Sequence, residues 1–266
     1  MPDMSFWDHL EELRWCLFRV IIALVIVLVG CFFALPYVFD DFILGPTHPD
    51  FFMYRLLGFA YGPAEKVDII NINVASQFIT HISTALWISL VLVFPYMMYQ
   101  IWVFVKPALY PKEIKGVRTA FAGGTLLFYI GCAVGYIVVF PIIFKFLTQY
   151  RIGAEVTNQI SLNSYMSIFL TMVFVMGLVF ELPVLAWLLS ALGVLNKKLL
   201  RSWRRYAVVV LLILAAVITP TGDPFTLMVV FIPLYLLYEF SILLCRNPKE
   251  EDPEPEEDTE PGESAA

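Results

Sequence analysis

The stretch VIIALVIVLVGCFFALPYVF, residues 20–39, decides the fold. None of its 20 residues is charged, and a helix of that length crosses roughly 30 Å of hydrocarbon, the apolar thickness of a bilayer. Just upstream, Leu10, Leu13 and Leu17 recur at helical spacing, which predicts an amphipathic turn that continues into the span. The N-terminus lacks the basic region, short apolar core and cleavage site of a signal peptide, so we expect this first helix to be retained.

The composition is typical of a membrane protein. Of 266 residues, 60% are apolar and 15% are charged, which would leave a water-soluble domain too little polar surface. The formal net charge of −6 arises in the tail, because nine of the 23 acids lie in the last 19 residues. Residues 1–247 carry a net charge of +2 and no basic stripe, which argues against a nucleic acid partner. Residues 247–266 are acidic and proline-bearing, so we expect a disordered tail.

Five further apolar stretches follow the first span. They lie at residues 85–105, within a helix expected to begin at 74, and at 119–146, 165–195, 207–218 and 225–245. Polar links are expected at 40–73, 106–118, 147–164 and 196–205. The stretch 207–218 has only 12 residues, about 18 Å of helix, so it is re-entrant or lies in thin membrane. The sequence predicts an all-α polytopic membrane protein with six transmembrane helices, and four spans plus a re-entrant hairpin is the alternative.

The basic residues outside the spans predict the orientation. Thirteen Lys and Arg residues lie in the N-terminus, the links 106–118 and 196–205 and the tail, which would share one side of the membrane. The other side keeps four, namely Arg55, Lys66, Lys145 and Arg151. Because basic loops stay in the cytoplasm, both termini are expected there. The count does not separate six spans from four plus a hairpin, since both return the tail to the same side.

Sequence motifs for enzyme, metal or cofactor chemistry are missing. The four cysteines, Cys16, Cys31, Cys132 and Cys245, form no CxxC pair and are interpreted as apolar fillers. The histidines are scattered, and no zinc-protease, nucleophile-elbow, dinucleotide-binding or P-loop pattern occurs. An intramembrane hydrolase would need a nucleophile and a base within the bilayer, and His81 is the only histidine near a span. We expect no catalytic residue, no metal and no cofactor.

Carboxylates gather where the first span begins. Asp8, Glu11 and Glu12 lie within five residues, and Glu113 stands in the link after the second span. Carboxylates on two elements can clamp a cation, and guanidinium fits best because it binds a carboxylate through two parallel hydrogen bonds. Alternatively, these acids favour the start of the helix electrostatically or pair with nearby bases such as Arg14.

Glu181 is the most informative residue inside a span. An ionisable group deep in the bilayer costs roughly 2.5 to 3.5 kcal/mol, so it must face protein or water. Pro183 removes a backbone donor and frees the carbonyl of Val179, so acid and kink together predict a polar notch in the fourth span. The alternative is a neutral glutamic acid that hydrogen-bonds a neighbouring helix. Glu239 and Asp223 are expected at the membrane interface.

Three more prolines predict that the helices do not form a straight bundle. Pro95, Pro141 and Pro233 should kink or end helices, because neighbouring helices in a membrane can satisfy the freed carbonyls. A curved or concave wall is therefore expected. The halves show no inverted repeat, which weakens the alternative function of a proton-coupled secondary transporter of a small solute with Glu181 as its carrier.

Several separated motifs resemble the TatC family, the polytopic subunit of the twin-arginine protein translocase. They are SFWDHLEELR at 5–14, FPYMMYQIWVFVKPALYPKEIK at 94–115, FYIGCAVGYIVVFP at 128–141, FELPV at 180–184, TPTGDPFT at 219–226 and IPLYLLYEFS at 232–241. The resemblance covers residues 4 to 246, and the motifs occur in the family's order. We therefore divide the chain into a six-helix membrane domain, residues 1–246, and the tail.

The resemblance implies a glove-shaped receptor without enzymatic activity in the bacterial inner membrane. Both termini would be cytoplasmic and the last two helices short. The protein would recognise Arg-Arg signal peptides of folded cargo proteins and organise single-span TatA/TatB-type subunits for export driven by the proton-motive force. Several copies would assemble in one receptor complex.

The resemblance also assigns roles to particular residues. Glu12 and Glu113 match the family's acidic signal-binding positions, and Arg14 and Phe104 match neighbouring positions that matter for recognition. Glu181 matches an intramembrane acid on the concave face that meets partner helices.

Two departures from the family pattern lie near the last span. Asp223 matches the acid of the last outer turn, but the turn TPTGDP has an extra residue. Leu227 stands where many relatives carry a polar residue such as Gln, which puts a polar contact with single-span partners there in doubt.

Overall fold

The structure, a computed structural model, describes residues 6–51, 54, 67–108, 114–153, 158–191 and 193–245. Its longest helices are α1 (Phe6–Val38), α3 (Ser76–Val105), α4 (Ile114–Val134), α6 (Leu162–Val179) and α10 (Pro224–Leu244). The shorter ones are α5 (Phe140–Gln149), α7 (Leu182–Ala191), α8 (Lys197–Ser202) and α9 (Arg204–Ile218). The predicted tail and Glu113 lie outside the described residues.

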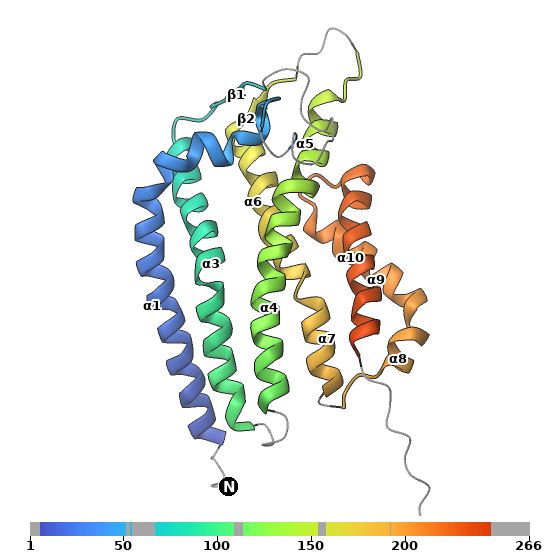
Figure 1. Ribbon diagram of the computed structural model, residues 1–266. Coiled ribbons are helices and arrows are strands. Elements are labelled where there is room, and N and C mark those ends of the chain that lie inside the picture. Colours follow the sequence, from blue (N-terminus) through green and yellow to red (C-terminus); the bar gives the residue numbers. More distant parts are fainter. Residues whose placement is uncertain are drawn as a thin grey trace, which may run out of the picture.

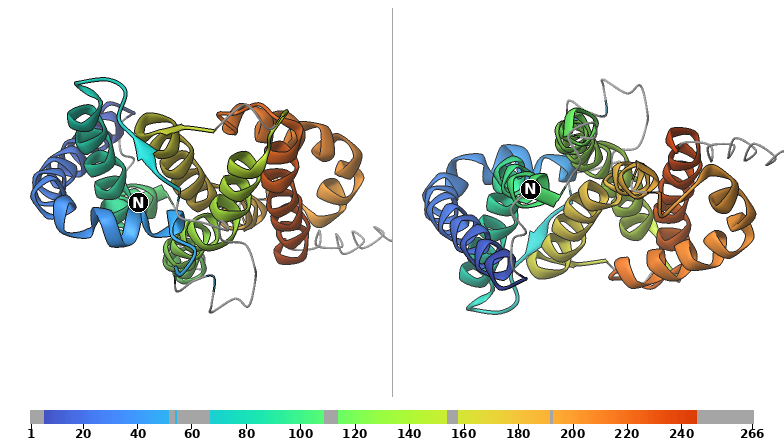
Figure 2. Two further views of the ribbon diagram at one scale, coloured as in Figure 1. Left: turned by 90° about the horizontal axis from the view of Figure 1, so that it is seen from above. Right: turned by 90° about the horizontal axis from the view of Figure 1, so that it is seen from below.

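The helices form an elongated layer rather than a round bundle. The views along the helices show α1 and α3 at one edge, α4 and α6 in the middle, and α8, α9 and α10 at the other edge (Figure 2). The start of α1 and the end of α10 lie at the same end of the molecule, which we call the terminal end (Figure 1). The opposite, loop end carries α5, the strands β1 (Ile69–Ile70) and β2 (Ile160–Ser161), and the segment after α1.

Five helical stretches are long and apolar enough to cross a membrane. They are Leu10–Thr47, Ser76–Val105, Gly116–Gln149, Leu162–Ala191 and Pro224–Leu244. The prediction of a helical, multi-pass membrane protein is therefore confirmed. Helix α9 has 15 residues, about 22 Å, and falls short of a full crossing, so the count of six spans stays a prediction.

The structure corrects several predicted boundaries. Helix α4 begins at Ile114 rather than at 119, because Val117 is buried and draws the start of the helix into the packing. The basic link 196–205 contains the short helix α8, which Asn196 caps by accepting a hydrogen bond from the Leu199 backbone at 2.7 Å. Strands β1 and β2 form a short parallel pair, which the all-α prediction did not include.

Helices α4 and α6 approach each other through glycines. A Cβ at Gly131 would lie 2.5 Å from the carbonyl oxygen of Met176, and one at Gly135 would lie 2.9 Å from that of Met172. From the facing side, a Cβ at Gly177 would lie 2.6 Å from a cysteine sulfur of α4. Helices in membranes use small residues in this way, because close backbone approach is what makes their packing favourable.

Aromatic rings fill the core at the loop end. Phe140 is fully buried, and its ring meets those of Tyr165 and Phe169 edge-on, at centroid distances of 5.4 and 5.0 Å. Pro141 follows directly, and the chain widens into a π-helical turn, Gly135–Val139, just before it. The predicted kink at Pro141 is thus accommodated inside a continuous helical stretch.

Pro95 inside α3 shows how a freed carbonyl is satisfied. Proline donates no hydrogen bond, so the carbonyl of Val91, four residues earlier, loses its partner within the helix. The Tyr129 hydroxyl of α4 donates to this carbonyl at 3.2 Å. The neighbouring helix therefore supplies the missing donor, as predicted for prolines in a membrane.

The carbonyl that Pro36 frees in α1 is also satisfied by a side chain of another helix, here a histidine. The freed carbonyl is that of Phe32, and Nε2 of His81 lies 2.8 Å from it while the two rings stack at 4.1 Å. Because a carbonyl only accepts, Nε2 must carry the proton. His81 therefore joins α3 to α1 and has a structural role.

Three buried or nearly buried tyrosines fix the segment that follows α1. Tyr136, Tyr165 and Tyr54 donate to carbonyls within residues 42–46, at 2.6, 2.5 and 2.8 Å. The acceptor of Tyr165 is the carbonyl of Ile43, whose side chain is fully buried. The Tyr136 and Tyr165 bonds hold this segment against the π-helical turn Gly135–Val139 and α6, and the Tyr54 bond closes the segment on itself.

We expect Tyr165→Phe to lower the free energy of unfolding by about 1 to 3 kcal/mol, because it leaves the buried Ile43 carbonyl without this donor. Thermal unfolding in detergent measures the change. Tyr150→Phe is the control, since that side chain is 62% exposed and should change stability little. Equal stability of the two variants would contradict the anchoring role.

Candidate functional site

A pocket of 350 Å³ opens between α1 and α3 at the terminal end, and we name it the α1–α3 pocket. Its lining comes from one face of each helix, because residues three or four apart lie on the same side. The lining residues are Glu11, Glu12, Trp15, Cys16 and Arg19 of α1, and Gln100, Val103 and Phe104 of α3. Two predicted site residues, Glu12 and Phe104, are thus brought together.

The two glutamates of the pocket differ in their surroundings. Glu12 is half-buried, and its Oε2 atom has no hydrogen-bond partner among the described residues. Glu11 instead accepts from Arg14 at 3.2 Å, with the two side chains 62% and 60% exposed. Arg14 does not line the pocket, and Glu12 contributes a buried carboxylate oxygen that has no donor among the described residues. Glu113 lies outside the described residues, and its place relative to this pocket stays a prediction.

Gln100 is a pocket residue that the sequence interpretation did not include. It is only 5% exposed, and its Nε2 donates to the Tyr96 hydroxyl at 2.7 Å. Its amide therefore presents a fixed polar group beside Phe104. The signal was present in the sequence, because an amide four residues before Phe104 interrupts an otherwise apolar helix face.

The helix that carries Glu181 is broken where the sequence predicted. Helix α6 ends at Val179 and α7 begins at Leu182, with Pro183 in its first turn. The backbone N–H of Phe180 donates to the Met176 carbonyl at 3.1 Å and closes α6. Glu181 therefore lies at the break itself, in the middle of the membrane-spanning stretch Leu162–Ala191.

The Glu181 side chain is enclosed by neighbouring helices. It is 8% exposed, and its Oε1 atom has no hydrogen-bond partner in the part of the chain that the structure describes. A Cβ at Gly124 of α4 would lie 2.7 Å from Oε2, and it would lie 3.2 Å from the methyl carbon of Met98 of α3. The carboxyl group thus packs against a glycine at the junction of three helices. Contact with partner helices stays a prediction.

The comparisons with known proteins agree with one another. The family model described as "Sec-independent protein translocase protein (TatC)" matches residues 8–233. The TatC of Deinococcus radiodurans is 35% identical over 246 residues, covering 92% of this chain and 87% of its own. The TatC of Blattabacterium from Periplaneta americana is 34% identical, covering 91% and 95%. The chain belongs to the TatC family.

A solved TatC structure agrees with the fold. The crystal structure described as "Twin Arginine Translocase Receptor- TatC" is 32% identical to this chain, with a TM-score of 0.72, and the match covers 89% of this chain and 97% of that one. A second crystal structure, in the detergent DDM, has a TM-score of 0.73. The chain is therefore a membrane subunit of a protein translocase, which is a transport family rather than a class of enzymes.

The departures from the TatC pattern near α10 have clear local roles. Leu227 is half-buried and packs against the main hydrophobic core, so an apolar side chain suits this position. Asp223 is the N-cap of α10, where its Oδ1 accepts from the Thr226 backbone at 2.8 Å and its Oδ2 from the Thr221 hydroxyl at 2.7 Å. Burial alone raises the pKa of Asp223, but these hydrogen bonds outweigh burial and hold the pKa below its ordinary value.

We expect Asp223→Ala to destabilise the protein by about 1 kcal/mol at neutral pH, because the α10 cap is lost. Since the folded-state pKa is lowered, the ionised cap stabilises the protein above the unfolded pKa. That stabilisation is lost as the pH falls through the folded pKa, which lies below the ordinary value of an aspartate. Unfolding in detergent should therefore show the full difference between wild type and variant at pH 7, and the difference should shrink as the pH is lowered toward the folded pKa. Asp68→Ala, at an exposed position, is the control.

Proposed function

We propose that the protein is the signal-peptide receptor of a twin-arginine translocase and that the α1–α3 pocket binds the Arg-Arg pair. The observation that carries this proposal is Glu12, which lines the pocket and whose buried Oε2 atom has no donor among the described residues. A buried acceptor without a donor is unfavourable by about 1 to 3 kcal/mol. An incoming guanidinium removes this cost and adds a charge-assisted hydrogen bond.

The pocket should favour an arginine over a lysine. A guanidinium is planar, presents parallel donors and stacks on aromatic rings, whereas an ammonium group is a compact, strongly hydrated charge. Trp15 and Phe104 supply rings beside the carboxylate of Glu12. Glu113, the second predicted acid, would take the other arginine of the pair.

The two arginines do not supply the whole affinity. Two charge-assisted pairs contribute at most about 6 kcal/mol, at roughly 3 kcal/mol each. Micromolar binding needs about 8 kcal/mol. The remainder should come from the apolar part of the signal peptide along the membrane-spanning helices.

We propose that the protein lies in the bacterial inner membrane with its terminal end in the cytoplasm. The basic residues outside the spans favour this orientation. The common position of the start of α1 and the end of α10 agrees with an even number of crossings. The pocket would then face the compartment in which cargo is synthesised and folded.

We further propose that single-span TatA/TatB-type subunits assemble on this protein and that the proton-motive force drives export. Glu181 is the residue we assign to partner contact within the membrane. The support for this role is an acid within a membrane-spanning stretch whose Oε1 has no hydrogen-bond partner among the described residues, which is unfavourable and typical of a functional site. Several copies of the chain would share one receptor complex.

Glu12→Gln should weaken binding of an Arg-Arg signal peptide by about 10- to 100-fold, because one charge-assisted pair is reduced to a neutral hydrogen bond. The measurement is a titration of the purified protein in nanodiscs with a labelled signal peptide. Peptides with Lys-Lys in place of Arg-Arg should bind the wild type weakly.

Glu11→Gln is the matched control, since Glu11 lies in the same turn but is exposed and paired with Arg14. It should change affinity by less than Glu12→Gln. Unchanged Arg-Arg affinity in Glu12→Gln, or equal binding of the Lys-Lys peptide to the wild type, would exclude the proposed site.

A further inference from the structure

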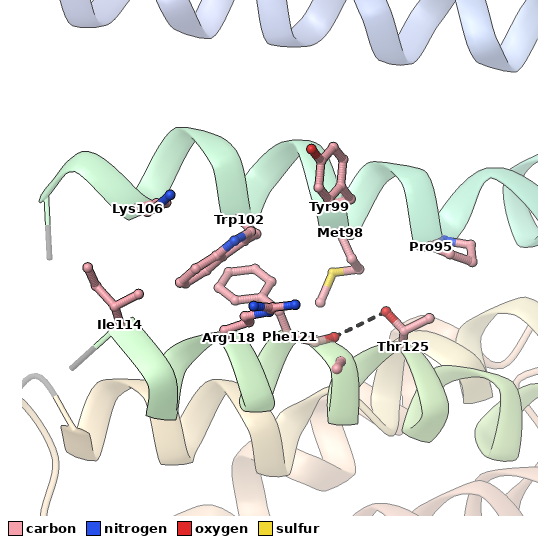
Figure 3. A pocket seen from close by; sticks show the side chains of 10 residues that line it. Pro95, Met98, Tyr99, Trp102, Lys106, Ile114, Arg118, Phe121 and Thr125 are labelled. Atoms are coloured by element: carbon pink, nitrogen blue, oxygen red, sulfur yellow. Dashed lines mark hydrogen bonds between the residues drawn. The ribbon is translucent and has the colours of Figure 1, made fainter. Parts of the chain in front are cut away.

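A second pocket lies on the other side of α3, against α4, and we name it the α3–α4 pocket. Its volume is 370 Å³, and its lining includes Met98 and Trp102 of α3, Lys106 directly after α3, and Arg118 and Phe121 of α4. Figure 3 shows Trp102 and Met98 pointing toward α4, with Lys106 at the end of the α3 helix. The rings of Trp102 and Phe121 meet at 5.7 Å and form an apolar wall.

The charge of this pocket is opposite to that of the α1–α3 pocket. Lys106 and Arg118 come from two different elements, and no acidic side chain is among its lining residues, all of which the structure describes. Both bases are exposed, so a ligand can reach them. The same stretch of α3 thus separates a pocket with two glutamates from a pocket with two bases.

The position of the pocket fits a membrane boundary. Lys106 follows Val105, the last residue of the membrane-spanning stretch Ser76–Val105. Trp102 and Tyr99 line the pocket one and two turns earlier, as expected where acyl chains meet headgroups. Farther into the span, Pro95 and Met98 make the lining apolar. Charge therefore lies at the mouth and apolar surface lies deeper.

We propose that the α3–α4 pocket binds one anionic phospholipid of the phosphatidylglycerol type. The phosphate would lie between Lys106 and Arg118, and an acyl chain would run along Met98 and Phe121. Basic pockets between transmembrane helices on the cytoplasmic side recognise anionic headgroups in this way. A soluble phosphate would use only the bases, whereas a lipid also uses the apolar floor. The inference does not rest on the signal-peptide site, because the α3–α4 pocket shares no lining residue with the α1–α3 pocket.

Trp102 provides a reporter inside the pocket. The protein is reconstituted in vesicles in which either phosphatidylglycerol or phosphatidylcholine is brominated near the headgroup, at the same mole fraction. Bromine quenches tryptophan fluorescence on contact. The part of the quenching that is seen in the wild type but not in Trp102→Phe therefore measures lipid contact at this pocket. We expect the brominated anionic lipid to occupy the pocket with a preference on the order of 10-fold over phosphatidylcholine.

The double variant Lys106→Gln/Arg118→Gln should lose this preference, and the charge-conserving Lys106→Arg/Arg118→Lys should keep it. A matched control is Lys197→Gln/Arg201→Gln, which removes the same charge from α8 at the same end of the molecule and should leave the preference intact. Equal quenching by the two lipids in the wild type would overturn the proposal, as would equal loss in the control variant. Displacement of the lipid by millimolar inorganic phosphate would overturn it too, by indicating a site for soluble anions.

Discussion

Replacing Gly131 by alanine is expected to destabilise the protein by about 3 kcal/mol, the upper end of what overpacking costs in a close-packed interior. The new methyl group would lie 2.5 Å from the carbonyl oxygen of Met176 and 2.8 Å from the Phe180 side chain. The first of these atoms belongs to the backbone of α6, so no side-chain rotation relieves the clash. Helix α6 would have to move away from α4.

Gly123 in the same helix makes a matched control with the opposite expected sign. A Cβ there meets no atom within 4 Å. Alanine has a higher helix propensity than glycine, so Gly123→Ala should stabilise α4 by about 0.5 to 1 kcal/mol. The same substitution at two positions eight residues apart is thus expected to give free energies of unfolding that differ by roughly 4 kcal/mol.

Thermal unfolding of the two variants in the same detergent measures this difference. Gly131→Ala should also reduce the yield of monodisperse protein, because exposed helix surfaces associate. If both variants unfold at the wild-type temperature, close approach of α4 and α6 is not what holds the middle of the layer together.

The sequence predicted the spans well and the contacts between them poorly. Six spans were predicted, and five of them coincide with helical stretches long and apolar enough to cross a membrane, because a long apolar stretch has few stable states other than a membrane helix. The glycine contact of α4 with α6 could have been found, since Gly131 and Gly135 have the spacing typical of close helix pairs. The parallel pair of β1 and β2 could not, because two-residue strands about 90 residues apart leave no periodic pattern.

The candidate site was predictable to a similar degree. Glu12 and Phe104 belong to different helices, and only a family resemblance joined them before the fold placed both in one pocket. Composition could not show that Arg14 pairs with Glu11 and lies outside the pocket, because helix phase decides it. The break at Glu181 was predicted from Pro183, but a missing donor does not break every helix, since α3 continues through Pro95 and α10 through Pro233.

The residue that packs against the Glu181 carboxyl group could not be predicted from the sequence. Gly124 lies in another helix, and its closeness to the carboxyl group depends on how α4 crosses the break between α6 and α7. His81 shows the same limit, since its partner is a carbonyl freed by Pro36 on a distant helix. Local chemistry predicts which group lacks a partner, and tertiary packing decides which side chain supplies it.

Glu181→Leu is expected to raise stability while it abolishes export. A buried carboxyl group with an unpartnered oxygen is unfavourable. Its removal from the membrane-spanning stretch should raise the free energy of unfolding by about 2 to 3 kcal/mol. Leucine fills a similar volume beside Gly124 and Met98 without a polar atom. Export should fail under the proposed function, because the polar group that meets partner helices is gone. Opposite changes in stability and activity are typical of functional sites.

Two further variants separate the role of the polar group from that of its surroundings. Glu181→Gln keeps a polar group of the same shape and should retain part of the export activity. Glu239→Leu should instead destabilise the protein, because the Glu239 carboxylate accepts from Arg204 at 2.5 Å and from Tyr235 at 3.1 Å. The readouts are unfolding in detergent and export of a reporter by cells that lack their own TatC. A Glu181→Leu variant that exports normally would remove Glu181 from the mechanism, and one that unfolds at a lower temperature would show that the buried acid has a partner which stabilises it.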